Sequence, residues 1–127
     1  MQKKISTSGR LTYSPNWIVL NLGRDFTNYY WTLIPKARRY GLNKPMYPGH
    51  ITVVRFKYEQ PDYSRWGYLD GARLSFKYSP IVEEDALYLF LRVWSEDIGR
   101  VRKHLGLPQF IHNRNNYHIT IANKKGL

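Results

Sequence analysis

The chain contains no cysteine, which excludes disulfide bonds, thiolate metal ligands and a cysteine nucleophile. It also lacks any run of 18 consecutive apolar residues, and a membrane-spanning helix requires about that length. The N-terminal segment MQKKISTSGR has none of the apolar core of a secretion signal. We therefore expect a protein that works in a cytoplasm and has no membrane partner.

Acidic residues are scarce. Nine Asp and Glu stand against 20 Lys and Arg, which gives a formal net charge of +11. Such an excess attracts anionic partners such as nucleic acid, nucleotides or an acidic surface, although it would also serve solubility alone. Hydrophobic residues make up 43% of the 127 residues and aromatics 16%, which is enough to build a core. We expect one globular domain over residues 1–127.

Hydrophobic periodicity predicts strands interspersed with two helical segments. The first helical segment follows residue 23 and contains Pro35, which predicts a bent helix or two short ones. The second begins at Ser95, a favoured N-cap residue, and ends near Gly106. The order is strand, helix, strand, then strand, strand, helix, strand, so the chain reads as two halves. The predicted strands cover 16–23, 50–58, 72–80, 86–95 and 117–123.

The tripeptide His-Ile-Thr occurs twice, beginning at His50 and at His118, and each copy lies in a predicted strand. Side chains alternate between the faces of a strand, so Thr52 shares a face with the first histidine and Thr120 with the second. The isoleucine between them points the other way. We expect the two strands to line one groove with two imidazoles and two hydroxyls.

These four side chains suit phosphodiester cleavage without a metal or other cofactor. Imidazole titrates near neutral pH, so one of His50 and His118 can accept a proton while the other donates one. The hydroxyls of Thr52 and Thr120 can donate hydrogen bonds to the non-bridging phosphate oxygens. The sequence leaves open which histidine is the base.

Two other readings of the histidines remain open. Both could be ordinary half-buried strand residues. They could also bind a metal, with His104 or His112 as a third ligand. The sequence has no HExxH spacing, and neither tripeptide contains a carboxylate. We otherwise expect His104 to lie at a helix end and His112 in a surface loop.

Candidate substrate contacts come from aromatic and basic residues near the motifs. Tyr13 and Trp66 fall in predicted loops, where aromatic rings can stack on bases or pack on neighbouring loop surface. Lys124 shares the face of His118 by strict alternation and is the favoured phosphate contact. Arg55 is out of phase with the other motif and is expected to point away.

The paired H-x-T motifs on strands, in a chain with this order of elements, resemble the 2H phosphoesterase superfamily. That superfamily includes the bacterial RNA 2′,3′-cyclic phosphodiesterases, also called 2′–5′ RNA ligases. The resemblance implies a bilobal α+β fold, in which two antiparallel sheets flank a central cleft and helices lie outside. It also implies metal-independent cleavage, with His50 and His118 as the acid–base pair and Thr52 and Thr120 as phosphate ligands.

Within the superfamily, the short chain, the basic and aromatic N-terminal half and the YHITIAN ending are similar to phage anti-CBASS nucleases. These degrade the cyclic oligonucleotides that bacterial immune synthases make as alarm signals. This similarity implies attack by a ribose 2′-hydroxyl on a 3′–5′ linkage, through a 2′,3′-cyclic phosphate, in a host cytoplasm. The sequence gives no sign of an obligate protein partner. Two alternatives remain: RNA-end processing at 2′,3′-cyclic phosphates or 2′–5′ linkages, and a basic RNA- or nucleotide-binding module without turnover.

Overall fold

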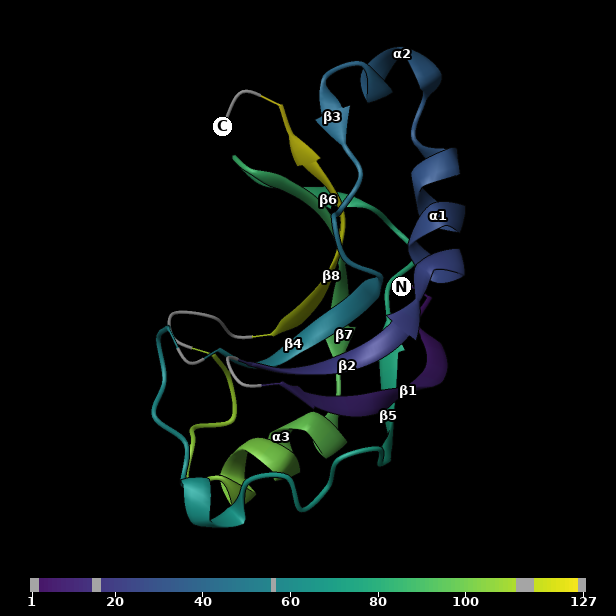
Figure 1. Cartoon of the computed structure of the whole chain (residues 1–127). Coiled ribbons are helices and arrows are strands. Elements are labelled where there is room, and N and C mark those ends of the chain that lie inside the picture. Colours follow the sequence, from purple (N-terminus) through teal and green to yellow (C-terminus); the bar gives the residue numbers. More distant parts are fainter. Residues whose placement is uncertain (1–2, 15–16, 56, 112–115, 126–127) are drawn as a thin grey trace.

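The computed structural model describes residues 3–14, 17–55, 57–111 and 116–125. In this part of the chain, eight antiparallel strands form one sheet in the order β3-β8-β4-β2-β1-β5-β7-β6 (Figure 1). The strands are β1 Ile5–Ser14, β2 Trp17–Gly23, β3 Leu42–Asn43, β4 Gly49–Arg55, β5 Arg73–Tyr78, β6 Glu83–Glu84, β7 Tyr88–Trp94 and β8 Tyr117–Lys124. The helices are α1 Arg24–Leu33, α2 Lys36–Arg39, the short 3₁₀ helix η1 Tyr63–Arg65 and α3 Glu96–His104.

The sheet closes on itself. β8 pairs with β7 as well as with β4, so six strands form a closed antiparallel barrel and β3 and β6 are additions to it. The predicted bilobal fold with two separate sheets is therefore wrong. The cause is β1, a strand that the sequence patterns did not indicate because its sequence is polar and contains a glycine. β1 pairs with β2 on one side and β5 on the other, and this joins the two halves.

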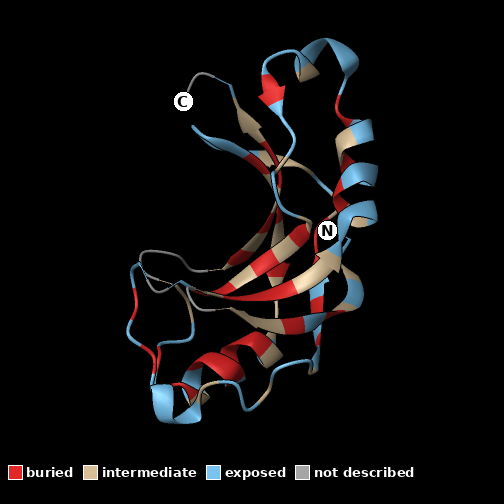
Figure 2. Cartoon of the chain, in the orientation of Figure 1, coloured by how far each residue is buried: buried red, intermediate tan, exposed pale blue. Residues whose placement is uncertain are grey.

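The apolar face of the sheet is the inside of the barrel. α3 contacts both β4 and β5, which lie on opposite sides of the ring of strands, so this helix lies across one mouth. α1 contacts β2, β4 and β8, and its Phe26 and Tyr30 pack against Tyr78 of β5, so it covers the other mouth (Figure 1). Buried residues alternate along the strands between the two helices (Figure 2). The polar residues of the strands consequently face outward.

Local sequence signals account for the helix boundaries. α1 ends at Leu33 and α2 begins at Lys36, which confirms that Pro35 divides the helical segment in two. The hydroxyl of Ser95 accepts a hydrogen bond from the Ile98 amide at 3.1 Å, which confirms the predicted N-cap. None of the helices in the described part of the chain is long and apolar enough to cross a membrane.

One arginine is fully buried where α3 meets the barrel. The Arg102 guanidinium forms an ion pair with the Glu59 carboxylate, and its Nη1 lies 2.9 Å from Oε1. It also donates to the carbonyl oxygens of Val53 at 2.6 Å, Pro108 at 2.8 Å and Phe110 at 3.0 Å. A buried guanidinium needs such partners to offset the loss of hydration. These bonds tie α3 and two loops to strand β4.

Candidate active site

The two His-Ile-Thr segments lie side by side in the barrel wall. β4 and β8 are antiparallel neighbours, with Ile51 directly opposite Ile119. Both isoleucines are fully buried and belong to the hydrophobic core, so the residues on either side of them point to the outer face. The structure thus brings the two copies of the tripeptide together, on the outer wall of one barrel and not across a cleft between two sheets.

We call the four outward side chains, His50, Thr52, His118 and Thr120, the His–Thr quartet. In this antiparallel register His50 lies beside Thr120, and Thr52 lies beside His118. The histidines therefore occupy one diagonal and the threonines the other. Diagonal neighbours in an antiparallel sheet are about 7–8 Å apart, which is close enough for two side chains to flank one phosphate. All four side chains are half-buried.

Each motif strand has a β-bulge at the residue that follows its threonine. In β4 the extra residue is Val53, because its two neighbours pair with consecutive residues of β2. In β8 the extra residue is Ile121, by the same criterion against β7. Bulges redirect side chains and are frequent beside active sites. The two copies of the motif thus share a backbone feature as well as a sequence. The carbonyl oxygen of the bulged Val53 is the one that accepts a hydrogen bond from Arg102.

The bulge in β4 places a cation on the outer face with the quartet. Strict alternation predicted that Arg55 points away from His50, and this is wrong because Val53 shifts the phase by one residue. Arg55 lies opposite Trp17 in β2 and is exposed. The Trp17 ring centroid is in turn 5.5 Å from the His50 imidazole. Arg55 is therefore the basic residue of β4 on the quartet's face.

The bulge in β8 has the opposite effect on the predicted phosphate contact. Beyond Ile121 the alternation reverses, so Lys124 does not share the face of the quartet. It lies opposite the buried Leu42, and its Nζ is 2.7 Å from the Glu84 carboxylate. Hydrogen bonds from Lys124 and Arg38 lower the pKa of Glu84. Lys124 is thus part of an ion-pair cluster beside the short outer strands.

The surroundings of His50 fix its orientation. Its Nδ1 lies 2.9 Å from the carbonyl oxygen of Pro48. A carbonyl can only accept a hydrogen bond, so Nδ1 carries a proton and Nε2 holds the lone pair of the neutral ring. The Trp17 ring packs against the imidazole in a T-shaped contact, and Asn21 of β2 lies directly opposite the histidine. An imidazole held in this tautomer is suited to accept a proton at Nε2.

His118 lies in a different environment. Its ring centroid is 5.8 Å from that of Phe90, and Arg92 of β7 lies directly opposite it. The guanidinium of Arg92 forms two hydrogen bonds with the Glu83 carboxylate, at 2.8 and 3.0 Å. The two histidines are therefore not equivalent. Sequence reasoning missed these neighbours, because which residues lie across from each histidine depends on strand register.

The two aromatic residues predicted to bind substrate lie elsewhere. Tyr13 is in β1, on the face of the buried Leu11, and burial raises the pKa of its phenol. Its ring makes an edge contact with Trp66 at a centroid distance of 4.9 Å, and Trp66 also packs against the core. The sequence pattern predicts a loop at Tyr13, and this is wrong because β1 continues to Ser14. The structure gives both rings a packing role away from the quartet.

In the described part of the chain, no third ligand joins His50 and His118 for a metal site. His104 is the last residue of α3, and its ring packs near that of Tyr68 at a centroid distance of 5.9 Å. His112 lies outside the described residues. Among the residues that are described, no group of three or more His, Cys, Asp or Glu side chains is placed to hold a metal ion.

Comparison with known proteins adds no identification. No known protein family matches the sequence, and no curated protein or solved structure is similar enough to count as a match. The resemblance to the 2H phosphoesterases consequently stays a prediction from the motifs. The case for a function rests on those motifs and on the geometry of the quartet.

Proposed function

We propose that the protein is a metal-independent phosphodiesterase that cleaves 3′–5′ linkages of ribonucleotides, with cyclic oligonucleotides as the expected substrates. The crossed arrangement of the quartet is the observation that supports this most. In an in-line displacement, the attacking and leaving oxygens lie on opposite sides of phosphorus and the non-bridging oxygens lie between them. Histidines on one diagonal and threonines on the other match that pattern of two proton-transfer sites and two charged oxygens.

The first step uses both histidines. His50, with its lone pair at Nε2, takes the proton of a ribose 2′-hydroxyl while the 2′-oxygen forms a bond to the adjacent phosphorus. The bond from phosphorus to the 5′-oxygen breaks, and protonated His118 gives its proton to that oxygen. The products are a 2′,3′-cyclic phosphate and a 5′-hydroxyl. His50 is now protonated and His118 neutral.

The second step reverses these roles. Neutral His118 takes a proton from water as the water oxygen bonds to phosphorus. The bond to the 2′-oxygen breaks and His50 returns its proton there, which leaves a 3′-phosphate and the original protonation states. In both steps the hydroxyls of Thr52 and Thr120 donate to the non-bridging oxygens as negative charge develops. Arg55 adds positive charge on the same face.

The test is product analysis by mass spectrometry over a panel of cyclic di- and trinucleotides in the presence of EDTA. We expect linear products that carry a 2′,3′-cyclic phosphate or a 3′-phosphate, and no cleavage where the 2′-hydroxyl is replaced by hydrogen. His50→Ala and His118→Ala should each lower the rate by about 10²- to 10⁴-fold. His104→Ala, which removes an imidazole at the end of α3, is the matched control and should leave the rate unchanged.

Other results would overturn the proposal. A requirement for a divalent metal would contradict the mechanism. Turnover of linear RNA ends with no action on cyclic substrates would favour RNA-end processing. If the wild type cleaves nothing and the two alanine variants bind nucleotide as it does, the protein is a binding module.

A further inference from the structure

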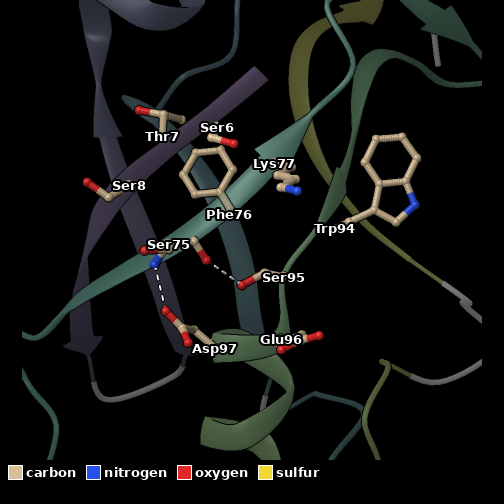
Figure 3. Close-up of a pocket in the computed structure, with 10 residues that line it drawn as sticks. All are labelled: Ser6, Thr7, Ser8, Ser75, Phe76, Lys77, Trp94, Ser95, Glu96 and Asp97. Carbon is tan, nitrogen blue, oxygen red and sulfur yellow. Dashed lines mark hydrogen bonds between the residues drawn. The ribbon is translucent and has the colours of Figure 1, made fainter. Parts of the chain in front are cut away.

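A hollow of about 690 Å³ opens on the barrel wall (Figure 3). In the strand order, β7 separates it from the strand of His118. It lies over β1, β5 and the end of β7, where Ser6 is opposite Lys77 and Lys77 is opposite Trp94. Residues opposite one another share a face of the sheet. Trp94 is two residues from Arg92, and Arg92 is opposite His118. The hollow and the quartet are therefore on one continuous outer surface.

The hollow exists because β5 and β7 diverge. They pair only at Lys77 and Tyr78, and the start of α3 enters the gap that follows. There the Ser75 amide donates to the Asp97 carboxylate at 2.8 Å, and the Ser95 hydroxyl donates to the Ser75 carbonyl at 2.7 Å (Figure 3). The backbone of β5 is thus hydrogen-bonded without a neighbouring strand on the edge opposite β1, and the space above it stays open.

The floor of this region carries uncompensated positive charge. Where β1 pairs with β5, the outward residues are only serines and cations, and Arg10 lies directly opposite Arg73. Like charges in opposite positions are unfavourable in isolation. No described carboxylate forms an ion pair with Arg10, Arg73 or Lys77. We call the six outward residues the β1–β5 strip: Ser6, Ser8, Arg10, Arg73, Ser75 and Lys77.

The acidic groups beside the hollow do not neutralise the strip. Asp97 accepts hydrogen bonds from the Ser75 amide and from Arg100, and Glu96 pairs with Arg100 on α3. At the other edge stands Trp94, a half-buried ring with the Lys4 ammonium 4.1 Å from its centroid. An aromatic ring beside a row of cations and hydroxyls is the combination that binds bases and phosphates of single strands.

We propose that the β1–β5 strip and Trp94 form a binding site for single-stranded nucleic acid, with one base stacked on Trp94 and phosphates on Lys77, Arg73 and Arg10. A duplex is disfavoured because its bases are already stacked and hidden from the ring. This inference goes beyond the proposed function, since binding here needs no cleavage.

The experiment measures binding of a fluorescein-labelled oligothymidylate DNA 12-mer, which lacks the 2′-hydroxyl needed for the proposed cleavage, by anisotropy at several salt concentrations. Trp94→Ala should weaken binding by about tenfold, and Trp94→Phe, which keeps a ring, by less. Lys77→Gln should reduce the slope of log K against log salt by about 0.7, since one phosphate contact is lost. Lys103→Gln and Tyr40→Ala remove an exposed charge and an exposed ring elsewhere, and should change nothing.

The proposal is overturned if Trp94→Ala binds like the wild type, or if Lys103→Gln changes the salt slope as much as Lys77→Gln. It is also overturned if an unlabelled 12-base-pair DNA duplex competes for binding as well as the unlabelled single-stranded 12-mer does. Should Trp94→Ala fail to fold, Trp94→Leu against Trp94→Phe gives the same comparison of apolar side chain with ring. Cleavage of cyclic oligonucleotides and binding of the 12-mer are separate measurements, so failure of the catalytic proposal and failure of this one are distinguishable.

Discussion

Replacement of Arg102 by methionine tests how α3 holds the first motif strand. Arg102 is fully buried, and the Glu59 side chain is only 7% exposed. Methionine fills a similar volume but removes the ion pair and the hydrogen bonds to three carbonyl oxygens. It leaves the Glu59 carboxylate buried without a cation, and the carbonyl of the bulged Val53 without this donor.

The expected loss is about 3–5 kcal/mol, the usual cost of removing one partner of a buried ion pair. Since a domain is stable by only about 5–15 kcal/mol, this is a large share of the total. For a chain of this length, it corresponds to a fall in Tm of about 10–20 °C. Urea denaturation followed by tryptophan fluorescence measures the free energy directly.

The matched control is Arg100→Met, the same substitution two residues earlier on α3. The Arg100 side chain is 70% exposed and pairs with Glu96 and Asp97, so its loss should cost less than about 1 kcal/mol. Adding Glu59→Gln to Arg102→Met should recover part of the stability, because no unpaired charge then remains. An Arg102→Met protein within 1 kcal/mol of the wild type would refute the reasoning.

Three further predictions follow from the strand register and the burial of single groups. Arg55→Gln should raise KM for a cyclic oligonucleotide about tenfold, whereas Lys124→Gln should leave KM unchanged. Equal effects of the two substitutions in steady-state kinetics would contradict the placement of Arg55, and not Lys124, on the face of the quartet. Gly49→Ala should cost about 1–3 kcal/mol in urea denaturation, because a Cβ there would be 2.9 Å from the carbonyl oxygen of the last residue of β2. Gly41→Ala, where the nearest atom is 3.7 Å away, should cost much less. Burial raises the pKa of Tyr117 to about 12. The stability that the neutral phenol contributes is therefore complete below about pH 10 and is lost as pH rises through 12. Tyr117→Phe should flatten that part of the pH–stability curve, and an unchanged curve would contradict this prediction.

Several features were readable from the sequence because they depend on neighbouring residues alone. Proline lacks the amide hydrogen that would continue a helix, so Pro35 divides the helical segment. Serine before an amphipathic segment is a favoured N-cap, and Ser95 is one. The alternation that sets a histidine and a threonine on one face of each motif strand is likewise local. A signal for the bulges was also present, since two apolar residues in succession, Val53–Val54 and Ile121–Ala122, interrupt the alternation after each threonine.

The fold was not readable in this way. β1 has the polar composition of a loop, and it forms a strand because both of its edges find partners, one in each half of the chain. β1 pairs with β2 and with β5, and β4 pairs with β8. These pairings join the two expected sheets into one closed barrel. The same closure assigns Tyr13 to the core side of β1 and separates it from the quartet.

The sequence by itself therefore determined the contents of the candidate site: two imidazoles and two hydroxyls, each pair on one face of a strand, with branched residues behind. Only the tertiary structure decided their arrangement. The pairing of Ile51 with Ile119 crosses histidines and threonines on the two diagonals, and the bulges bring Arg55 to that face and take Lys124 from it. The physical reason is that alternation follows from the bonding of one chain segment, whereas register follows from hydrogen bonds and packing between segments far apart in sequence.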